Sequence, residues 1–411
     1  MRKRFVLFTI LLIVITFSFK TGFSFGREKD DFYKELEIFS ECLAIIEKKY
    51  VDEKPAQDLI YGAMQGTLAS LDPFSQFMTP EEFKNLLVET EGKFGGLGIE
   101  ITMRNSILTI VSPMEDTPAW RAGIKAGDII IKIDGELTKG ITLNDAVKKM
   151  RGDPETKVTL TIFREKDRTV KDIEIVRDII KIKDIKRPGI LEDGVGYVKI
   201  GEFRETTSKD LGIALSKINK EELKALIIDV RNNPGGLLSS AIDVSSRFLE
   251  EGKIVVSTNS RTEKEIVYKS VYLSEKYLDI PIVVLINKGS ASGSEILAAA
   301  LRENNRAILL GETTFGKGSV QTIIPLSDGA ALRLTTSKYY TPNGGSIHEK
   351  GIDPDVVVEE ASTEEASTEE VKEDVFKEFE NNGAFDYKKD YQIVRAFDLI
   401  KGLLVLYPGK E

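Results

Sequence analysis

The sequence predicts a multidomain protein that combines α+β and α/β architecture. We expect N-terminal helices, a β-rich domain, an α/β core of repeated strand-loop-helix units and a helical C-terminal tail. The 411 residues are enough for two or three domains with separate cores. Apolar residues change along the chain from helical spacing to short strand-like runs, and then to buried strands that each precede a loop and a helix.

Changes in composition and periodicity place the expected boundaries. The segments are a signal peptide or membrane anchor at 1–25, an N-terminal helical region at 26–90, a β-rich domain at 91–178, the α/β core at 179–358, an acidic linker at 359–370 and a helical tail at 371–411. The linker repeats Glu-Ala-Ser-Thr-Glu in tandem, a composition that does not form a core. In the tail, apolar residues at helical spacing predict a helix over 391–407.

The first residues have the pattern of a targeting segment. A basic stretch, Arg2 to Arg4, precedes the apolar run Phe5 to Phe19, which is typical of a signal peptide. No A-x-A cleavage site follows, so an uncleaved membrane anchor is the alternative. We therefore expect an exported protein, periplasmic or otherwise extracytoplasmic, that is either free or anchored to the inner membrane.

The N-terminal region carries an apolar stripe at helical spacing, which predicts a helix with one apolar face. The stripe consists of Leu36, Phe39, Leu43, Ile46 and Tyr50. Because long a/d repeats are absent, we expect this face to be ordinary core rather than a dimer seam.

Another helix is expected to begin with Thr79 as its N-cap and Pro80 at the first helical position.

The β-rich segment resembles a PDZ domain. Strand-like runs at 108–111, 129–133, 158–163 and 171–175 and a helix at 143–150 surround a Gly-Gly-Leu-Gly-Ile loop and the stretch Pro118 to Ile130. In PDZ domains such a loop binds a peptide's C-terminal carboxylate and the adjacent strand pairs with the peptide. The resemblance implies peptide-binding residues at Gly96, Leu97, Gly98 and Ile99. The alternative is that these glycines serve backbone packing alone.

The α/β core contains two polar loops that each follow a buried strand. Strands are expected at 226–230, 282–286 and 307–310, and the loops at 231–236 and 287–293 follow the first two. Loops at the carboxyl ends of parallel strands lie at the same edge of the sheet, so we expect these loops to meet. The second loop carries three serines ahead of a helix, where unpaired N–H groups can hold an oxyanion. Its Ser292 and Glu295 also fit a capping box, and the residues alone do not choose among the serines.

The amino-acid composition restricts the catalytic groups available at the edge of the sheet where these two loops are expected to meet. One cysteine and one histidine, His348, leave too few ligands for a typical zinc site and disfavour imidazole catalysis. A lysine is therefore the more natural base for a serine nucleophile. Lys317 lies between two glycines, but Gly318 takes the place of the hydroxyl residue that a phosphate loop requires. With a net charge of −9, the chain is an improbable nucleic-acid binder. We expect no metal and no cofactor.

Three motifs follow one another in the α/β core. They are Arg231-Asn-Asn-Pro-Gly-Gly, Gly289-Ser-Ala-Ser-Gly-Ser-Glu and Phe315-Gly-Lys-Gly-Ser-Val-Gln. Their order resembles that of the carboxyl-terminal processing proteases, also called tail-specific proteases. An N-terminal stretch beginning Leu71-Asp-Pro-Phe and the inserted PDZ domain match this family too. The resemblance runs from residue 35 to residue 358 and implies a serine endopeptidase that cleaves exported proteins.

The resemblance also implies roles for particular residues. The catalytic residues would be Ser292, Lys317 and Gln321, and the oxyanion hole would be formed by Gly235, Gly236 and Gly293. Substrates would be proteins or peptides with exposed apolar C-termini, recognised by the PDZ domain, which can also gate access to the site. Assembly into a homo-oligomer through the terminal helices is a further implication.

Two other functions fit parts of the same pattern. One is a catalytically silent relative that binds exported proteins through its PDZ domain. The other is a scaffold at the cell envelope, anchored by its N-terminal segment and with the acidic linker as a tether. Both predict stable complexes without new peptide ends.

Overall fold

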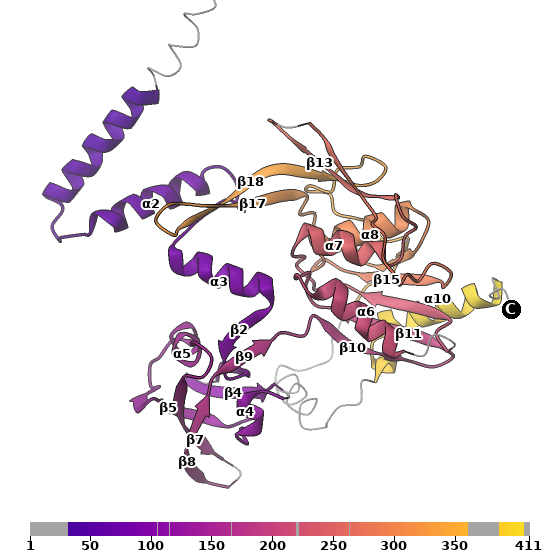
Figure 1. Ribbon diagram of the computed structural model, residues 1–411, viewed down its shortest axis with the longest axis horizontal. Coiled ribbons are helices and arrows are strands. Elements are labelled where there is room, and N and C mark those ends of the chain that lie inside the picture. Colours follow the sequence, from indigo (N-terminus) through magenta and orange to yellow (C-terminus); the bar gives the residue numbers. More distant parts are fainter. Residues whose placement is uncertain are drawn as a thin grey trace, which may run out of the picture.

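A computed structural model describes residues 32–360 and 386–406, apart from 105, 115, 166, 219–221 and 263. The expected leader at 1–25 and most of the acidic linker lie outside the described residues. Figure 1 shows the N-terminal helices and the β-rich domain on one side and the α/β core on the other. In the described part of the chain, no helix is both long and apolar enough to cross a membrane.

The centre of the core is a six-stranded sheet, as the repeated strand-loop-helix pattern predicts. Its order is β10 (Ile185–Ile190), β11 (Val195–Ile200), β12 (Ala225–Asp229), β15 (Ile282–Ile286), β16 (Ile308–Gly311) and β19 (Val356–Val357). All neighbours from β11 to β19 are parallel, and β10 is antiparallel. The loops after β12 and β15 therefore leave the same edge of the sheet.

Helices cover both faces of this sheet. One face packs against α6 (Thr207–Lys217), α7 (Leu238–Ser246) and α8 (Gly293–Glu303). The other face is covered by the tail helix α10 (Tyr391–Leu406), which follows the short helix η1 (Tyr387–Lys389). The predicted tail helix is confirmed, and its Ile393, Phe397 and Ile400 are buried in the core instead of projecting from it.

A second, antiparallel sheet extends from the core to the N-terminal helices. It pairs β1 (Gln76–Met78), β18 (Ala331–Tyr340), β13 (Ile254–Ser260) and β14 (Ile266–Lys269), and β17 (Ser319–Pro325) also pairs with β18. Strands β17 and β18 form an antiparallel hairpin within this sheet. Because β1 belongs to this sheet, the expected N-terminal helical region contains one strand as well.

The β-rich domain has its own hydrophobic core and the predicted helix at Leu143–Met150, α5. Its other elements are β2 (Lys93–Gly96), β3 (Ile99–Arg104), β4 (Ile107–Pro113), α4 (Pro118–Arg121), β5 (Ile129–Ile133), β6 (Glu136–Leu137), β7 (Lys157–Arg164) and β8 (Thr169–Val176). The strand β9 (Asp178–Lys181) pairs with β2 and leads back to the core.

The expected burial of the N-terminal apolar stripe is wrong. Residues 32–49 are helical, but Leu36 and Phe39 remain 45% and 44% exposed. Among the described residues, the nearby core cluster includes Leu68 of α2 (Ala56–Ala69) but no residue of this helix, and α3 (Pro80–Glu91) follows further along the chain. The predicted start of α3 is confirmed, because Thr79 and Glu82 exchange capping hydrogen bonds.

Candidate active site

A cleft of about 720 Å³ lies where the two polar loops of the core meet the β17–β18 hairpin. It is lined by Gly235, Gly236, Ser292, Lys317 and Gln321, so the structure brings most of the predicted catalytic residues together. Leu86 and Thr90 of α3 close one side of the cleft. Five of the six residues implied for catalysis thus line one cavity, although they come from three separate parts of the chain.

Ser292 occupies a strained position at the start of α8. Its φ of 51° and ψ of −109° lie outside the regions that serine usually adopts, and its side chain is nearly buried. Strain of this kind persists only where surrounding contacts enforce it, and it is common at active sites. The neighbouring hydroxyls are already committed, because Ser290 Oγ donates to Val230 O at 2.8 Å and Ser294 Oγ to Asn233 O at 2.9 Å. Of the three serines, only Ser292 lines the cleft.

The carboxylate of Glu295 joins the serine loop to the lysine loop. Its Oε2 accepts hydrogen bonds from the N–H groups of Ser292 at 2.7 Å and Lys317 at 2.9 Å. Its Oε1 accepts from the Gly316 N–H at 2.7 Å and the Thr314 hydroxyl at 2.6 Å. Burial raises the pKa of Glu295, and these four donors oppose the rise. The capping pattern identified the bond to Ser292, whereas nothing in the sequence indicated the contacts 19 to 22 residues away.

Lys317 is half-buried, and its surroundings disfavour the charged amine. Burial lowers the pKa of Lys317, the positive charge of Arg333 lowers it further, and Glu295 opposes the decrease. The Lys317 Nζ atom lies 5.0 Å from the centre of the Phe74 ring. Nothing in the sequence indicated that Phe74 contacts Lys317 or that Arg333 reaches the cleft, to which the β17–β18 pairing brings it.

Gln321 reaches the cleft from near the start of strand β17. Its Nε2 donates to Ser319 Oγ at 2.8 Å, so the amide nitrogen is held within its own strand. The β17–β18 register shifts between Val320 and Gln321. The extra residue, Thr336, belongs to β18, so the bulge lies in the strand that pairs with the one carrying Gln321.

The glycines of the first loop approach Ser292 closely. Gly235 and Gly236 have φ values of 102° and 138°, and a Cβ on Gly235 would lie 2.7 Å from the Cβ of Ser292 and 2.8 Å from the Gly293 nitrogen. The Gly235 N–H donates to Asn233 Oδ1 at 2.9 Å. Among the described hydrogen bonds of this loop, the N–H of Gly236 is not used, and Gly293 begins a helix, where N–H groups lack intrahelical partners.

Tyr339 is a cleft residue that sequence reasoning missed. Its ring is 4% exposed, and burial raises the pKa of its hydroxyl to about 12, while a hydrogen bond with the Ser292 side chain opposes the rise. The residue lies in β18, and nothing in the sequence shows which residues of that strand face the serine.

The predicted peptide-binding loop lies in the β-rich domain, and none of its four residues lines the cleft. Gly98 has a φ of 75°, and a Cβ there would collide with Thr117 at 2.4 Å. The carbonyls of Leu97 and Gly98 are fixed by the N–H groups of Ala119 at 3.0 Å and Met114 at 2.8 Å. Both the packing role and the peptide-binding role of these glycines are compatible with this geometry.

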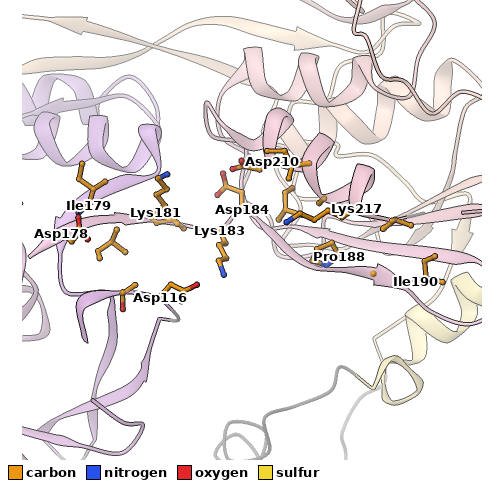
Figure 2. Close-up of a pocket in the computed structure, with 18 of the residues that line it drawn as sticks. Asp116, Asp178, Ile179, Lys181, Lys183, Asp184, Pro188, Ile190, Asp210 and Lys217 are labelled. Carbon is orange, nitrogen blue, oxygen red and sulfur yellow. The ribbon is translucent and has the colours of Figure 1, made fainter. Parts of the chain in front are cut away.

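A second groove of about 820 Å³ separates the β-rich domain from the core (Figure 2). Asp116 and Asp178 line it from the β-rich side, and Asp210 and Lys217 of α6 from the core side. It contains none of the predicted catalytic residues. Among the described residues, no group of three or more His, Cys, Asp or Glu could hold a metal ion.

Comparisons with known proteins agree with this architecture. Residues 194–358 match peptidase family S41, residues 109–164 match the PDZ domain, and residues 21–82 match the N-terminal domain of the activating protease CtpB. A carboxy-terminal-processing protease of Bartonella bacilliformis is 48% identical over 80% of this chain and 76% of its own length. A probable CtpA-like serine protease of Staphylococcus aureus is 36% identical over 86% of this chain and 71% of its own.

Among solved structures, a putative S41 protease from Bacteroides fragilis has the same fold, with a TM-score of 0.55 at 15% identity over 88% of this chain and 97% of its own. The α/β core and the attached PDZ domain, together with these similarities, define a serine-type peptidase. The chain belongs to peptidase family S41, among the carboxy-terminal-processing proteases.

Proposed function

We propose that this peptidase is an endopeptidase that cleaves exported proteins, with Ser292 as the nucleophile and Lys317 as the general base. The observation that carries the proposal is the shared Glu295 oxygen, which binds the backbone N–H groups of both residues. This contact fixes the two loops next to each other at the cleft. The lowered pKa of Lys317, caused first by burial and then by Arg333, favours the neutral amine that a base requires.

In the first step, the Ser292 Oγ bonds to the scissile carbonyl carbon, and its proton passes to Lys317 Nζ. The N–H groups of Gly236 and Gly293 stabilise the resulting oxyanion; we favour Gly236 over Gly235 because the Gly235 N–H is bonded to Asn233. When the C–N bond breaks, the Lys317 ammonium returns the proton to the leaving amine. The carbonyl oxygen of the Gln321 amide orients the lysine.

In the second step, a water molecule attacks the acyl ester of Ser292. Lys317 accepts a proton from the water and returns it to the Ser292 oxygen as the ester bond breaks. Two half-reactions thus restore the enzyme, and water is the only reactant besides the substrate.

The PDZ domain supplies substrate selection in this proposal. The N–H groups of the loop Gly96 to Ile99 bind the terminal carboxylate of a substrate, and the adjacent strand β3 pairs with its last residues. Apolar C-termini fit this mode, because PDZ grooves bind alternate side chains of an extended peptide. Export would be directed by residues 1–25, and the exposed apolar face of helix 32–49 is the candidate surface for a homo-oligomer.

The test compares cleavage of an unfolded protein that ends in apolar residues by the parent enzyme and by S292A and K317A. Both variants should lose cleavage. The matched control is K288A, whose side chain is 82% exposed and which should retain cleavage. Turnover that persists in S292A or in K317A would reject the dyad, and binding without new peptide ends in the parent would indicate a silent binding protein.

A further inference from the structure

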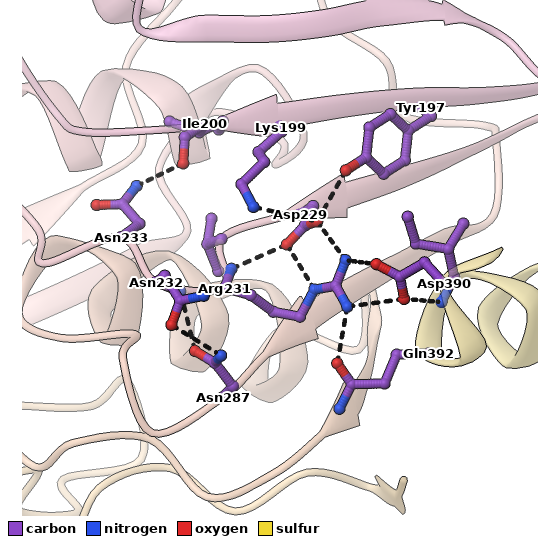
Figure 3. Close-up of polar contacts among 12 residues, drawn as sticks. Tyr197, Lys199, Ile200, Asp229, Arg231, Asn232, Asn233, Asn287, Asp390 and Gln392 are labelled. Atoms are coloured by element: carbon purple, nitrogen blue, oxygen red, sulfur yellow. Dashed lines mark hydrogen bonds and ion pairs between the residues drawn. The ribbon is translucent and has the colours of Figure 1, made fainter. Parts of the chain in front are cut away.

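The C-terminal helix contacts the first residue of the glycine loop through a buried ion-pair network (Figure 3). The guanidinium of Arg231 is 6% exposed and is shared by two carboxylates. Asp229 accepts from Arg231 Nε at 3.0 Å and from Nη2 at 2.7 Å. Asp390, just ahead of α10, accepts from Nη1 at 3.0 Å and from Nη2 at 2.8 Å. The Oε1 atom of Gln392 also accepts from Nη1, at 2.8 Å.

Asp229 cannot take over the contacts that Asp390 makes. It is fully buried, and its two oxygens already accept from the Tyr197 hydroxyl at 2.8 Å and from the Arg231 N–H at 2.9 Å. Without Asp390, the Nη1 side of Arg231 would keep only Gln392 as a partner. Removal of one partner of a buried charge destabilises the folded state. We therefore expect the guanidinium of Arg231 to move toward other hydrogen-bond acceptors or toward water.

Movement of Arg231 would be transmitted to the catalytic loops. The next residue, Asn232, donates its N–H to Asn287 Oδ1 at 2.9 Å. The carbonyl of Asn233 accepts from the Ala291 N–H at 3.0 Å, beside the nucleophile, and its side-chain oxygen accepts from the Gly235 N–H at 2.9 Å. A continuous chain of bonds therefore joins α10 to both walls of the cleft.

We propose that Asp390 is a positioning residue for catalysis, which holds Arg231 and, through it, the loop 231–236 in the geometry that faces Ser292. The C-terminal helix is then part of the active-site support and not an appended tail. This inference rests on the proposed function, since it needs Gly236 and Gly293 to stabilise the oxyanion.

The variant D390N weakens the contact with Arg231 without removing the cap of the C-terminal helix. Asparagine still caps a helix, so the bond to the Ile393 N–H, 3.1 Å in the parent, can be kept while the negative charge is lost. We expect kcat to fall about 10- to 100-fold, because a misplacement of about 1 Å costs on that order. KM should change less than kcat and stay within about twofold, because the PDZ domain, which binds the substrate's C-terminus in the proposed function, lies away from Asp390.

The matched control is D398N, on the same helix, where the carboxylate is 56% exposed and pairs with Arg395 at 3.5 Å. It should retain the parent kcat. All rates are measured well below the unfolding temperature of each variant. If D390N does not fold, Q392L provides the second test. It removes the bond to Arg231, together with the bond from Gln392 Nε2 to the Val358 carbonyl, and keeps both carboxylates. Its kcat should fall in the same direction.

The outcomes distinguish the two proposals. A parent-like kcat in folded D390N, or a loss confined to KM, overturns the positioning role while S292A remains inactive. Full activity in S292A rejects the proposed function itself, whatever D390N does.

Discussion

Replacement of Glu295 by Gln tests how the two catalytic loops are held together. Glutamine keeps one acceptor oxygen, so its amide nitrogen must face one of the two pairs of donors that the carboxylate binds. The least costly orientation turns the nitrogen toward Thr314, whose hydroxyl can rotate to accept, and leaves the Gly316 N–H, now bonded at 2.7 Å, without a partner. One buried unsatisfied donor costs about 1–3 kcal/mol, and the opposite orientation would leave two.

We therefore expect E295Q to reduce the free energy of unfolding by about 1–3 kcal/mol in chemical denaturation. The pH–rate profile adds a second readout. Because the negative charge of Glu295 raises the pKa of Lys317, its removal lowers that pKa, and the acidic limb of kcat/KM should move to lower pH. An unchanged unfolding free energy, or an acidic limb displaced to higher pH, would refute this reasoning.

The remaining predictions concern three other side chains. R333M removes the positive charge that lowers the pKa of Lys317, so the acidic limb should move to higher pH; R333K should restore it, and equal profiles for both variants would contradict the electrostatic role. Y339F removes the hydroxyl bonded to Ser292 and should slow acylation about 2- to 10-fold, as one net hydrogen bond allows, with the unfolding temperature retained. Burial raises the pKa of Asp390 but the bonds and charge of Arg231 lower it overall, so its contribution to stability is present above the ordinary value of 3.8 and is lost as pH falls below it. Between neutral pH and about pH 3, the free energy of unfolding of D390N should therefore fall less than that of the parent enzyme. An equal decrease in both proteins would argue against this contribution.

Local patterns predicted the elements of this fold well. The helix at 143–150 and the strand at 282–286 have the predicted bounds, because capping, turn residues and β-branched runs are local signals. The N-terminal apolar stripe was misjudged, since periodicity shows that a face is apolar but not what covers it. Its exposure in a single chain is consistent with the dimer seam that the sequence also allowed.

The support of the candidate site depends on contacts that no local pattern contains. Arg231 and Asp390 are separated by 159 residues and meet only because α10 packs on the sheet. Arg333 reaches Lys317 through the register of the hairpin, which alternation does not fix. The catalytic residues themselves remain a prediction from family motifs, and the structure adds the reason that they can lie together.

The most direct test of the account is the titration of the Lys317 amine itself. NMR of the enzyme with ¹³C-labelled lysine, assigned by comparison with K317R, would report the pKa of this group in the intact chain. The pKa of the Lys317 amine should lie below the ordinary 10.5 and should rise in R333M. An amine that titrates at or above 10.5 in the parent enzyme would contradict the claim that Lys317 serves Ser292 as a neutral base.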